Sequence, residues 1–201
     1  MGGLAVFFPG IGYTADKPLL YYSRRLATER GYEVRPLSYG GFPHGVKDDA
    51  DKMAESCRSA LAQAGNMLAD LDLTAYDDIL FVGKSVGTIV AARLAAVSPA
   101  AAKIRLVLFT PLEETFDYPL GEAIVFTGTD DPWVGRASSR IPELCRQRGI
   151  PCFVLPNANH SLESGDCRED VQALARIMEQ TGRFIASADF RGTPPDSHGP
   201  A

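Results

Sequence analysis

Short apolar runs alternate along this chain with longer segments in which apolar residues recur every three or four positions. The runs are rich in β-branched and aromatic residues, which is typical of strands, and the longer segments have the period of amphipathic helices. The pattern predicts six strands, at residues 4–9, 32–37, 79–82, 104–109, 123–126 and 152–155.

Five helices are predicted between and after these strands. Leu19, Tyr22 and Leu26 share one face of the first helix, which ends before Gly31 because glycine suits the left-handed position after a helix. The second helix covers 53–71 and carries charged residues on its outer face. The other three are centred on residues 86–94, 141–145 and 171–178.

This alternation predicts an α/β fold: a doubly wound, mostly parallel sheet of about six strands flanked by helices. The strands at 79–82 and 104–109 show no regular alternation of polar and apolar residues. Strands of this kind are covered by helices on both faces, so we expect these two at the centre of the sheet.

The composition agrees with one folded domain. The chain has 201 residues, of which 45% are hydrophobic and 22% are charged, enough to bury one sizeable core. We expect this domain to span 1–188. The last residues, 189–201, contain little that could be buried, so we expect a disordered tail that excludes His198 from the chemistry.

Charge and cysteine content argue against several classes of function. The net charge is -5 and Lys and Arg are scattered, so no basic face for nucleic acid is expected. No apolar stretch has the roughly 20 residues of a membrane span, and the first residues lack the pattern of a secretory signal. The four cysteines have neither metal-ligand nor disulfide spacing. We expect a cytoplasmic monomer or homodimer that acts on a small molecule, with no nucleic acid and no membrane as partner.

The clearest chemical motif is Gly83-Lys84-Ser85-Val86-Gly87, which fits G-x-S-x-G. It lies between a predicted strand and a predicted helix, where such a turn exposes a nucleophilic serine. The same residues could end a phosphate-binding loop, G-x-x-x-x-G-K-[ST]. That loop needs a glycine where this chain has Asp78, and the residues between are predicted strand, so the serine interpretation is favoured.

A serine nucleophile needs a base and an acid that orients the base. His160 follows the last predicted strand and is expected at the same sheet edge as Ser85, so we favour it over His44. Asp130 and Asp131 follow the fifth predicted strand, and either could orient the imidazole. One of the two is also expected to form a turn or a helix cap.

The order serine, aspartate, histidine, each after a strand, resembles the α/β-hydrolase superfamily, specifically its small lidless bacterial members of the dienelactone-hydrolase-like and carboxylesterase-like kind. The resemblance covers about 4–184. It selects Asp131, which stands three residues after Gly128 in the stretch G-x-x-D-x-x-V. It also identifies 159–163 as the histidine loop.

The resemblance further implies an oxyanion hole made by the backbone N–H groups of Ile11 and Val86. The family has a His-Gly pair after its third strand, and this chain has Pro9-Gly10 there, which leaves the backbone role intact. Because the first predicted strand corresponds to that third strand, we expect the family's first antiparallel strands to be missing. The segment before the fifth strand is too short for a lid domain, which implies an open site.

We therefore expect a serine hydrolase that cleaves a small carboxylester or thioester through an acyl-enzyme on Ser85, without a metal or organic cofactor. If neither aspartate reaches the histidine, Glu113 or Glu114 is the alternative acid. The alternatives in function are a noncatalytic ligand-binding protein on the same scaffold and a peptidase with the same triad. Candidates for the substrate pocket are the aromatic residues of nearby loops, Tyr13, Tyr39 and Trp133, with Phe42 and Tyr118.

Overall fold

The structure is a computed structural model that describes residues 2–47, 49–134 and 140–186. The predicted tail at 189–201 lies outside these residues, as do the last two positions of the predicted domain. Within the described ranges, no helix combines the length and the apolar character needed to cross a membrane.

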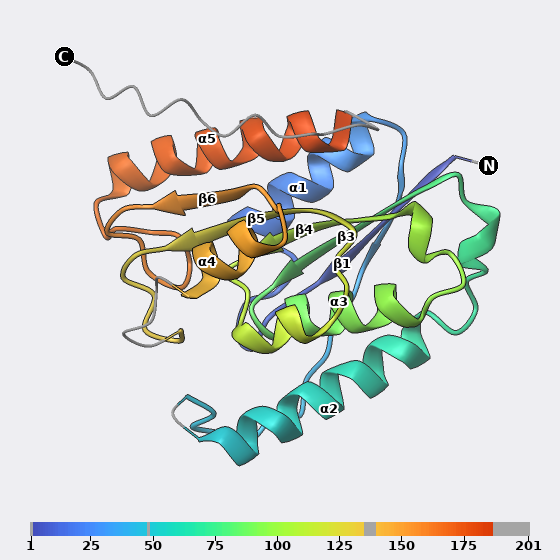
Figure 1. The fold of residues 1–201 in the computed structure, drawn as a ribbon, viewed down its shortest axis with the longest axis horizontal. Coiled ribbons are helices and arrows are strands. Elements are labelled where there is room, and N and C mark those ends of the chain that lie inside the picture. Colours follow the sequence, from blue (N-terminus) through green and yellow to red (C-terminus); the bar gives the residue numbers. More distant parts are fainter. Residues whose placement is uncertain (1, 48, 135–139, 187–201) are drawn as a thin grey trace.

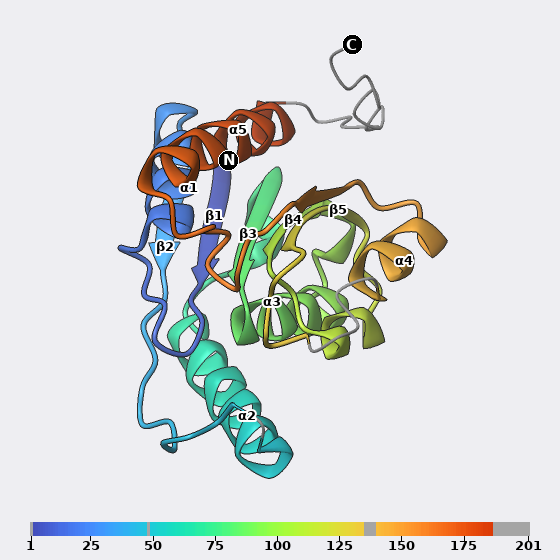
Figure 2. The same ribbon diagram turned by 90° about the vertical axis from the view of Figure 1, so that its left-hand side faces the viewer.

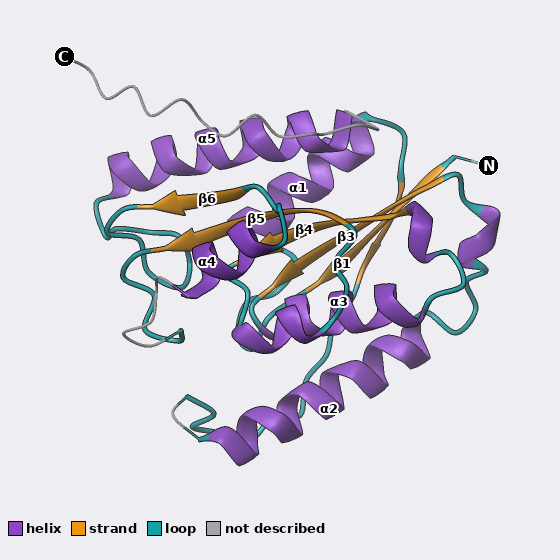
Figure 3. Ribbon diagram, in the orientation of Figure 1, coloured by secondary structure: helices purple, strands orange, loops and turns teal. Residues whose placement is uncertain are grey.

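The predicted strands form one sheet (Figures 1 and 3). Among the described residues the sheet has six strands in the order β2-β1-β3-β4-β5-β6, and all its pairings are parallel. This confirms the predicted α/β class, and the strand ends differ from the predicted ones by two residues at most. The strands are β1 (Gly3–Phe8), β2 (Glu33–Pro36), β3 (Asp78–Lys84), β4 (Ile104–Phe109), β5 (Glu122–Gly128) and β6 (Cys152–Leu155).

Helices cover both faces of the sheet (Figure 2). Two helices, α1 and α5, pack on each other on one face, whereas α3 and α4 cover the other face and α2 packs against α3. The helices in the described residues are α1 (Pro18–Glu29), α2 (Ala50–Met67), α3 (Val86–Val97), α4 (Arg140–Gln147) and α5 (Cys167–Ala186).

Both predicted bounds of the second helix were wrong. The helix begins at Ala50 and not at Met53. Helix α2 ends at Met67, and Leu71 lies beyond it. Leu71 still packs against the core from the turn that follows the helix. The spacing of apolar residues therefore continues past the end of the helix, because a residue in the following turn can also pack against the core.

Each strand contributes alternate residues to two core layers. On β3, Ile79 and Phe81 belong to the layer under α2 and α3, whereas Leu80 and Val82 belong to the layer under α1 and α5. The strands β3 and β4 lie at the centre of the sheet and are almost completely buried. The predicted central position of these two strands is confirmed.

The strand order creates a switch point between β1 and β3. The chain leaves β1 toward β2 on one side, and it leaves β3 toward β4 on the other side. In open parallel sheets, ligands bind in the crevice that forms between two such loops at the carboxyl ends of the strands. Here these loops start at Pro9 and Ser85. The fold therefore predicts a ligand site at the edge of the sheet that carries the G-x-S-x-G turn.

Candidate active site

The turn between β3 and α3 holds Ser85 in a strained backbone conformation. Its φ is 55° and its ψ is -125°, a region that costs a residue with a side chain about 1–3 kcal/mol. The surroundings hold it there: the Ser85 N–H donates to the carbonyl of Phe109 at 3.1 Å, and Thr88 Oγ1 donates to the Ser85 carbonyl at 2.6 Å. This is the strand-turn-helix context that the G-x-S-x-G motif predicts.

Two glycines let α3 approach the strand ends closely. A Cβ on Gly87 would overlap the carbonyl oxygen of Phe8 and lie 2.5 Å from that of Pro9. A Cβ on Gly83 would lie 2.8 Å from the carbonyl oxygen of Gly87 and from Thr88 Cα. Neither position can carry a side chain unless the turn moves, so the glycines hold the serine in place.

Ser85, His160 and Asp131 form a continuous chain of hydrogen bonds. Ser85 Oγ lies 2.8 Å from His160 Nε2, and His160 Nδ1 lies 2.7 Å from Asp131 Oδ2. Ser85 is 6% exposed and Asp131 2% exposed. An ionised carboxylate can only accept, so Nδ1 carries the hydrogen and Nε2 is left to accept the serine proton.

The structure brings Asp131, and not Asp130, to the imidazole. The second oxygen of Asp131 accepts the backbone N–H of Trp133 at 2.9 Å. One carboxylate therefore makes the turn that was expected of one member of the pair and also holds the histidine. Asp130 is exposed and bonds to the preceding threonine, and Glu113, an alternative acid, pairs with Arg140 at 2.9 Å.

The histidine loop is anchored from several sides. Thr110 Oγ1 donates to the carbonyl oxygen of His160 at 3.2 Å, and Asn159 Oδ1 accepts the N–H of Ser161 at 2.7 Å. The Trp133 ring stacks on the imidazole, with centroids 5.2 Å apart and planes inclined by 26°. The segment that begins at Thr110 is expected from the sequence to line the site, but its contact with the histidine loop is not, because a threonine after an apolar strand carries no motif.

Burial lowers the pKa of His160. Loss of water disfavours the imidazolium and is the largest cause, and the hydrogen bond to Asp131 opposes it. The positive charge of Lys84 lowers the pKa further. The imidazole is therefore neutral, and able to accept a proton, at a lower pH than it would be in water.

The loop after β1 lies against the serine. A Cβ on Gly10 would be 3.1 Å from Ser85 Cβ. Gly10 and Tyr13 close the loop by reciprocal backbone hydrogen bonds of 3.0 and 3.3 Å, with Ile11 between them. In the described loops and caps, no hydrogen bond engages the N–H of Ile11 or of Val86. Both predicted oxyanion donors thus have an N–H available for a bound oxygen.

Two of the predicted substrate-binding aromatics have clear structural contacts. The Tyr13 ring lies 5.0 Å from Lys84 Nζ, and its hydroxyl accepts the N–H of Leu19 at 3.0 Å. Tyr39 packs edge to face on Phe42, with centroids 6.2 Å apart. The Tyr39 hydroxyl is buried and finds no hydrogen-bond partner among the described residues.

The third, Trp133, lines a cavity and stacks on His160 with the same ring. The cavity has a volume of about 370 Å³ and is bounded by the start of α2, the segment after β4 and the loop after β5. Tyr118 lines a different cavity of about 330 Å³ between α2 and α3. The residues that bound the first cavity are Val46, Lys47, Asp49, Ala50, Met53, Leu112, Glu113, Glu114, Pro132, Trp133 and Val134.

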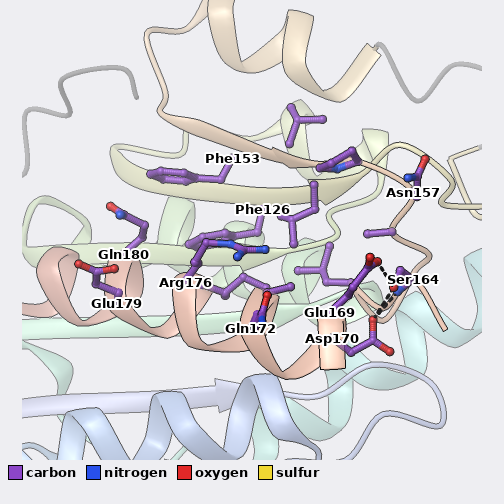
Figure 4. Close-up of a pocket in the computed structure, with 17 residues that line it drawn as sticks. Phe126, Phe153, Asn157, Ser164, Glu169, Asp170, Gln172, Arg176, Glu179 and Gln180 are labelled. Carbon is purple, nitrogen blue, oxygen red and sulfur yellow. Dashed lines mark hydrogen bonds between the residues drawn. The ribbon is translucent and has the colours of Figure 1, made fainter. Parts of the chain in front are cut away.

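A larger cavity of about 610 Å³ lies between β6 and α5 (Figure 4). Its apolar wall includes the stacked rings of Phe126 and Phe153, 5.0 Å apart, and Arg176 of α5 also lines it. Ser164 and Asp170 bond to each other at one end. The triad lines neither this cavity nor that of Trp133. Trp133 stacks on His160, whereas no residue that lines the larger cavity has a stacking or side-chain hydrogen-bond contact with the triad in the described part of the chain, so only the cavity of Trp133 is connected to the candidate active site.

Lys84 is buried beneath the turn and is 1% exposed. It is the last residue of β3, and 79–82 are strand and not loop. A phosphate-binding lysine has to face a ligand that enters from solvent, so the nucleotide alternative does not fit. The burial has no signal in the sequence, since lysines are normally exposed.

Within the described residues, no group of His, Cys, Asp and Glu side chains is placed to hold a metal ion. The four cysteines are free thiols. His44 is exposed.

Comparison with known proteins finds likeness in structure. No protein-family profile matches the sequence, and no curated protein is significantly similar to it. A serine hydrolase without lid from Xanthomonas campestris has a TM-score of 0.55 at 15% identity, over 93% of this chain and 84% of that one. Est1E from Butyrivibrio proteoclasticus, solved with ferulic acid bound, has a TM-score of 0.60 at 14% identity, over 92% and 90%. An α/β serine hydrolase homologue from Coxiella burnetii has a TM-score of 0.51 at 18% identity, over 91% and 84%.

Proposed function

This chain has the α/β-hydrolase fold, and from that premise we propose that it is a serine hydrolase. The proposed substrate is a small ester-like molecule, a carboxylester or a thioester, which is cleaved through an acyl-enzyme on Ser85. A fold by itself does not determine a reaction, so the proposal rests on the site.

The observation that carries the proposal is the hydrogen-bond chain from Ser85 through His160 to Asp131. Both links are within the distance over which a positioned base can take a proton. The three side chains follow three different strands, β3, β5 and β6. A buried carboxylate is costly unless it is paired, and here it is placed to stabilise the imidazolium that forms when the serine loses its proton.

In the proposed reaction, His160 Nε2 takes the proton of Ser85 Oγ as this oxygen attacks the carbonyl carbon of the substrate. Asp131 remains ionised and stabilises the imidazolium. The N–H groups of Val86 and Ile11 stabilise the oxyanion, and loss of one such donor typically costs about 100- to 1,000-fold in turnover. The imidazolium then protonates the leaving group, and water, activated by the same base, releases the acid and restores the serine.

The cavity beside Trp133 is the candidate for holding the substrate. Its volume of about 370 Å³ suits a small molecule, and Trp133 connects it to the base by stacking on His160. Tyr39 remains a candidate contact, whereas the hydroxyl of Tyr13 is already engaged by Leu19.

The proposal is tested by reacting the purified protein with a fluorophosphonate probe and measuring the intact mass. We expect one probe per wild-type chain, no labelling of Ser85→Ala and much slower labelling of His160→Ala. Ser164→Ala is the control, because Ser164 is an exposed serine that bonds to Asp170 and not to the triad.

A panel of p-nitrophenyl esters and acyl thioesters, assayed in parallel, separates the two substrate classes. A folded wild-type protein that neither reacts with the probe nor cleaves any member of the panel would overturn the proposal. The noncatalytic ligand-binding alternative would then be the better interpretation.

A further inference from the structure

The buried lysine next to the nucleophile has no place in the mechanism above. Alternation along β3 puts Lys84 on the same face as Leu80 and Val82, in the layer under α1 and α5. The side chain leaves the strand only one residue before Ser85, yet Lys84 is 1% exposed. The amine is therefore held in the protein interior, on the residue that directly precedes the nucleophile.

The contacts of this amine are unusual for a cation. Lys84 Nζ lies 5.0 Å from the centre of the Tyr13 ring, close enough for a cation–π interaction. The ring is fixed, because the Tyr13 hydroxyl accepts the N–H of Leu19 at 3.0 Å. No carboxylate forms an ion pair with Lys84 among the residues that the structure describes. The ammonium therefore acts on other charges at longer range.

The positive charge of Lys84 interacts with two members of the triad. Asp131 stabilises the ammonium, and the ammonium in turn disfavours the imidazolium of His160. All three groups are largely buried, and water screens charges poorly there, so an interaction without direct contact still has an effect. The interaction favours a neutral base.

We propose that Lys84 is a positioning residue of the triad: its ammonium, buried against the Tyr13 ring on the residue before Ser85, adds to burial in opposing a second positive charge on His160, and so favours the imidazole as a base. This inference rests on the proposed function for its effect on activity. Its effect on the titration of His160 does not depend on any substrate.

The proposal has a second consequence above neutral pH. Burial lowers the pKa of Lys84 to about 7, and the charge of Asp131 opposes this change. Lys84 is thus an ammonium in weakly acidic solution, where it repels a proton on His160, and a neutral amine in basic solution, where it no longer does. Tyr13 is the titratable residue whose ring contacts the amine. Burial raises the pKa of Tyr13 to about 12, with a smaller contribution from Glu163, so Tyr13 stays protonated over the same pH range.

The test compares wild type with Lys84→Met and with the neutral, polar variant Lys84→Gln, over pH 4.5–9. The first readout is the imidazole titration of His160 by nuclear magnetic resonance, which is practicable because the chain has three histidines. The second is the pH dependence of the rate of fluorophosphonate labelling. The exposed Lys103, changed to methionine, is the control.

We expect the pKa of His160 to rise by about half to one pH unit in both Lys84 variants. The acid limb of the labelling rate should move up by the same amount, which lowers the rate about 3- to 10-fold at pH values below the His160 midpoints of both proteins. The wild-type and variant rates should converge above pH 8, and Lys103→Met should titrate like wild type.

A His160 titration that is unchanged or moves down in a folded Lys84 variant would overturn the proposal. If one variant does not fold, the other provides the same comparison. Absence of labelling in wild type would refute the proposed hydrolase activity alone, because the His160 titration would still decide whether Lys84 acts on the triad.

Discussion

Changing Lys84 to methionine is expected to stabilise the protein, and to do so most strongly at low pH. Methionine keeps an unbranched, flexible side chain in the space of the lysine and removes the charge. Because Lys84 is 1% exposed, its ammonium has lost nearly all the water that surrounds it in the unfolded chain. Such a loss opposes folding unless an ion pair offsets it.

The magnitude follows from the pKa of this amine. Burial lowers the pKa of Lys84 from 10.5 to about 7. A difference of one pKa unit corresponds to about 1.4 kcal/mol, so the lysine costs the folded state about 5 kcal/mol below pH 7, where both states carry the proton. Between pH 7 and 10.5 the unfolded chain binds a proton that the folded chain lacks, so the wild-type free energy of unfolding rises with pH.

The assay is urea unfolding at pH 6, 7, 8 and 9, followed by circular dichroism and by the fluorescence of Trp133, the one tryptophan of the chain. We expect Lys84→Met to be more stable than wild type by about 5 kcal/mol at pH 6 and by about 2 kcal/mol at pH 9. Lys103→Met removes an exposed ammonium that donates to the carbonyl oxygens of Thr74 and Tyr76, and its effect on stability should not vary over this pH range. A constant advantage of Lys84→Met at every pH, or a less stable variant at pH 6, would refute the reasoning.

Two further changes test the turn and the acid. Gly87→Ala should destabilise the protein by about 3 kcal/mol in urea, because the new Cβ would overlap the Phe8 carbonyl oxygen; Gly65→Ala, in α2 with no atom within 4 Å of the added Cβ, should instead stabilise it by about 0.5–1 kcal/mol. Equal effects would contradict the close packing. Asp131→Asn should slow fluorophosphonate labelling by about 10,000-fold with little loss of stability, whereas Asp130→Asn should label at close to the wild-type rate. Comparable slowing in both would argue against Asp131 as the acid.

Much of the fold could be predicted from the sequence, because the sequence patterns that indicate strands, helices and turns are local. Six apolar runs separated by helical periods predict a parallel sheet covered on both faces, and the observed strand ends lie close to the predicted ones. The G-x-S-x-G turn could be predicted too, since a strained turn between strand and helix needs glycines at fixed positions. Residues that follow parallel strands must share one edge of the sheet, which placed His160 near Ser85.

The aspartate was less certain from the residues alone. Asp130 and Asp131 are neighbours in one loop, and only a family resemblance separated them. The structure separates them by the path of the loop, which buries one carboxylate against His160 and leaves the other exposed. A shift of the turn by one residue would exchange the two carboxylates, so that the other one pointed toward His160. The sequence pattern does not show which of the two arrangements the loop adopts.

The environment of Lys84 and Trp133 was decided by tertiary structure alone. Alternation along a strand fixes the face on which Lys84 lies, but its burial depends on Tyr13, which arrives from the loop after another strand. Trp133 was expected in a substrate pocket, and it also stacks on the catalytic candidate His160. By itself the sequence determined the elements and the order of the reactive side chains, because periodicity and turn chemistry are local. Burial and electrostatics at the site were decided by tertiary structure, because they depend on which distant segments cover each side chain.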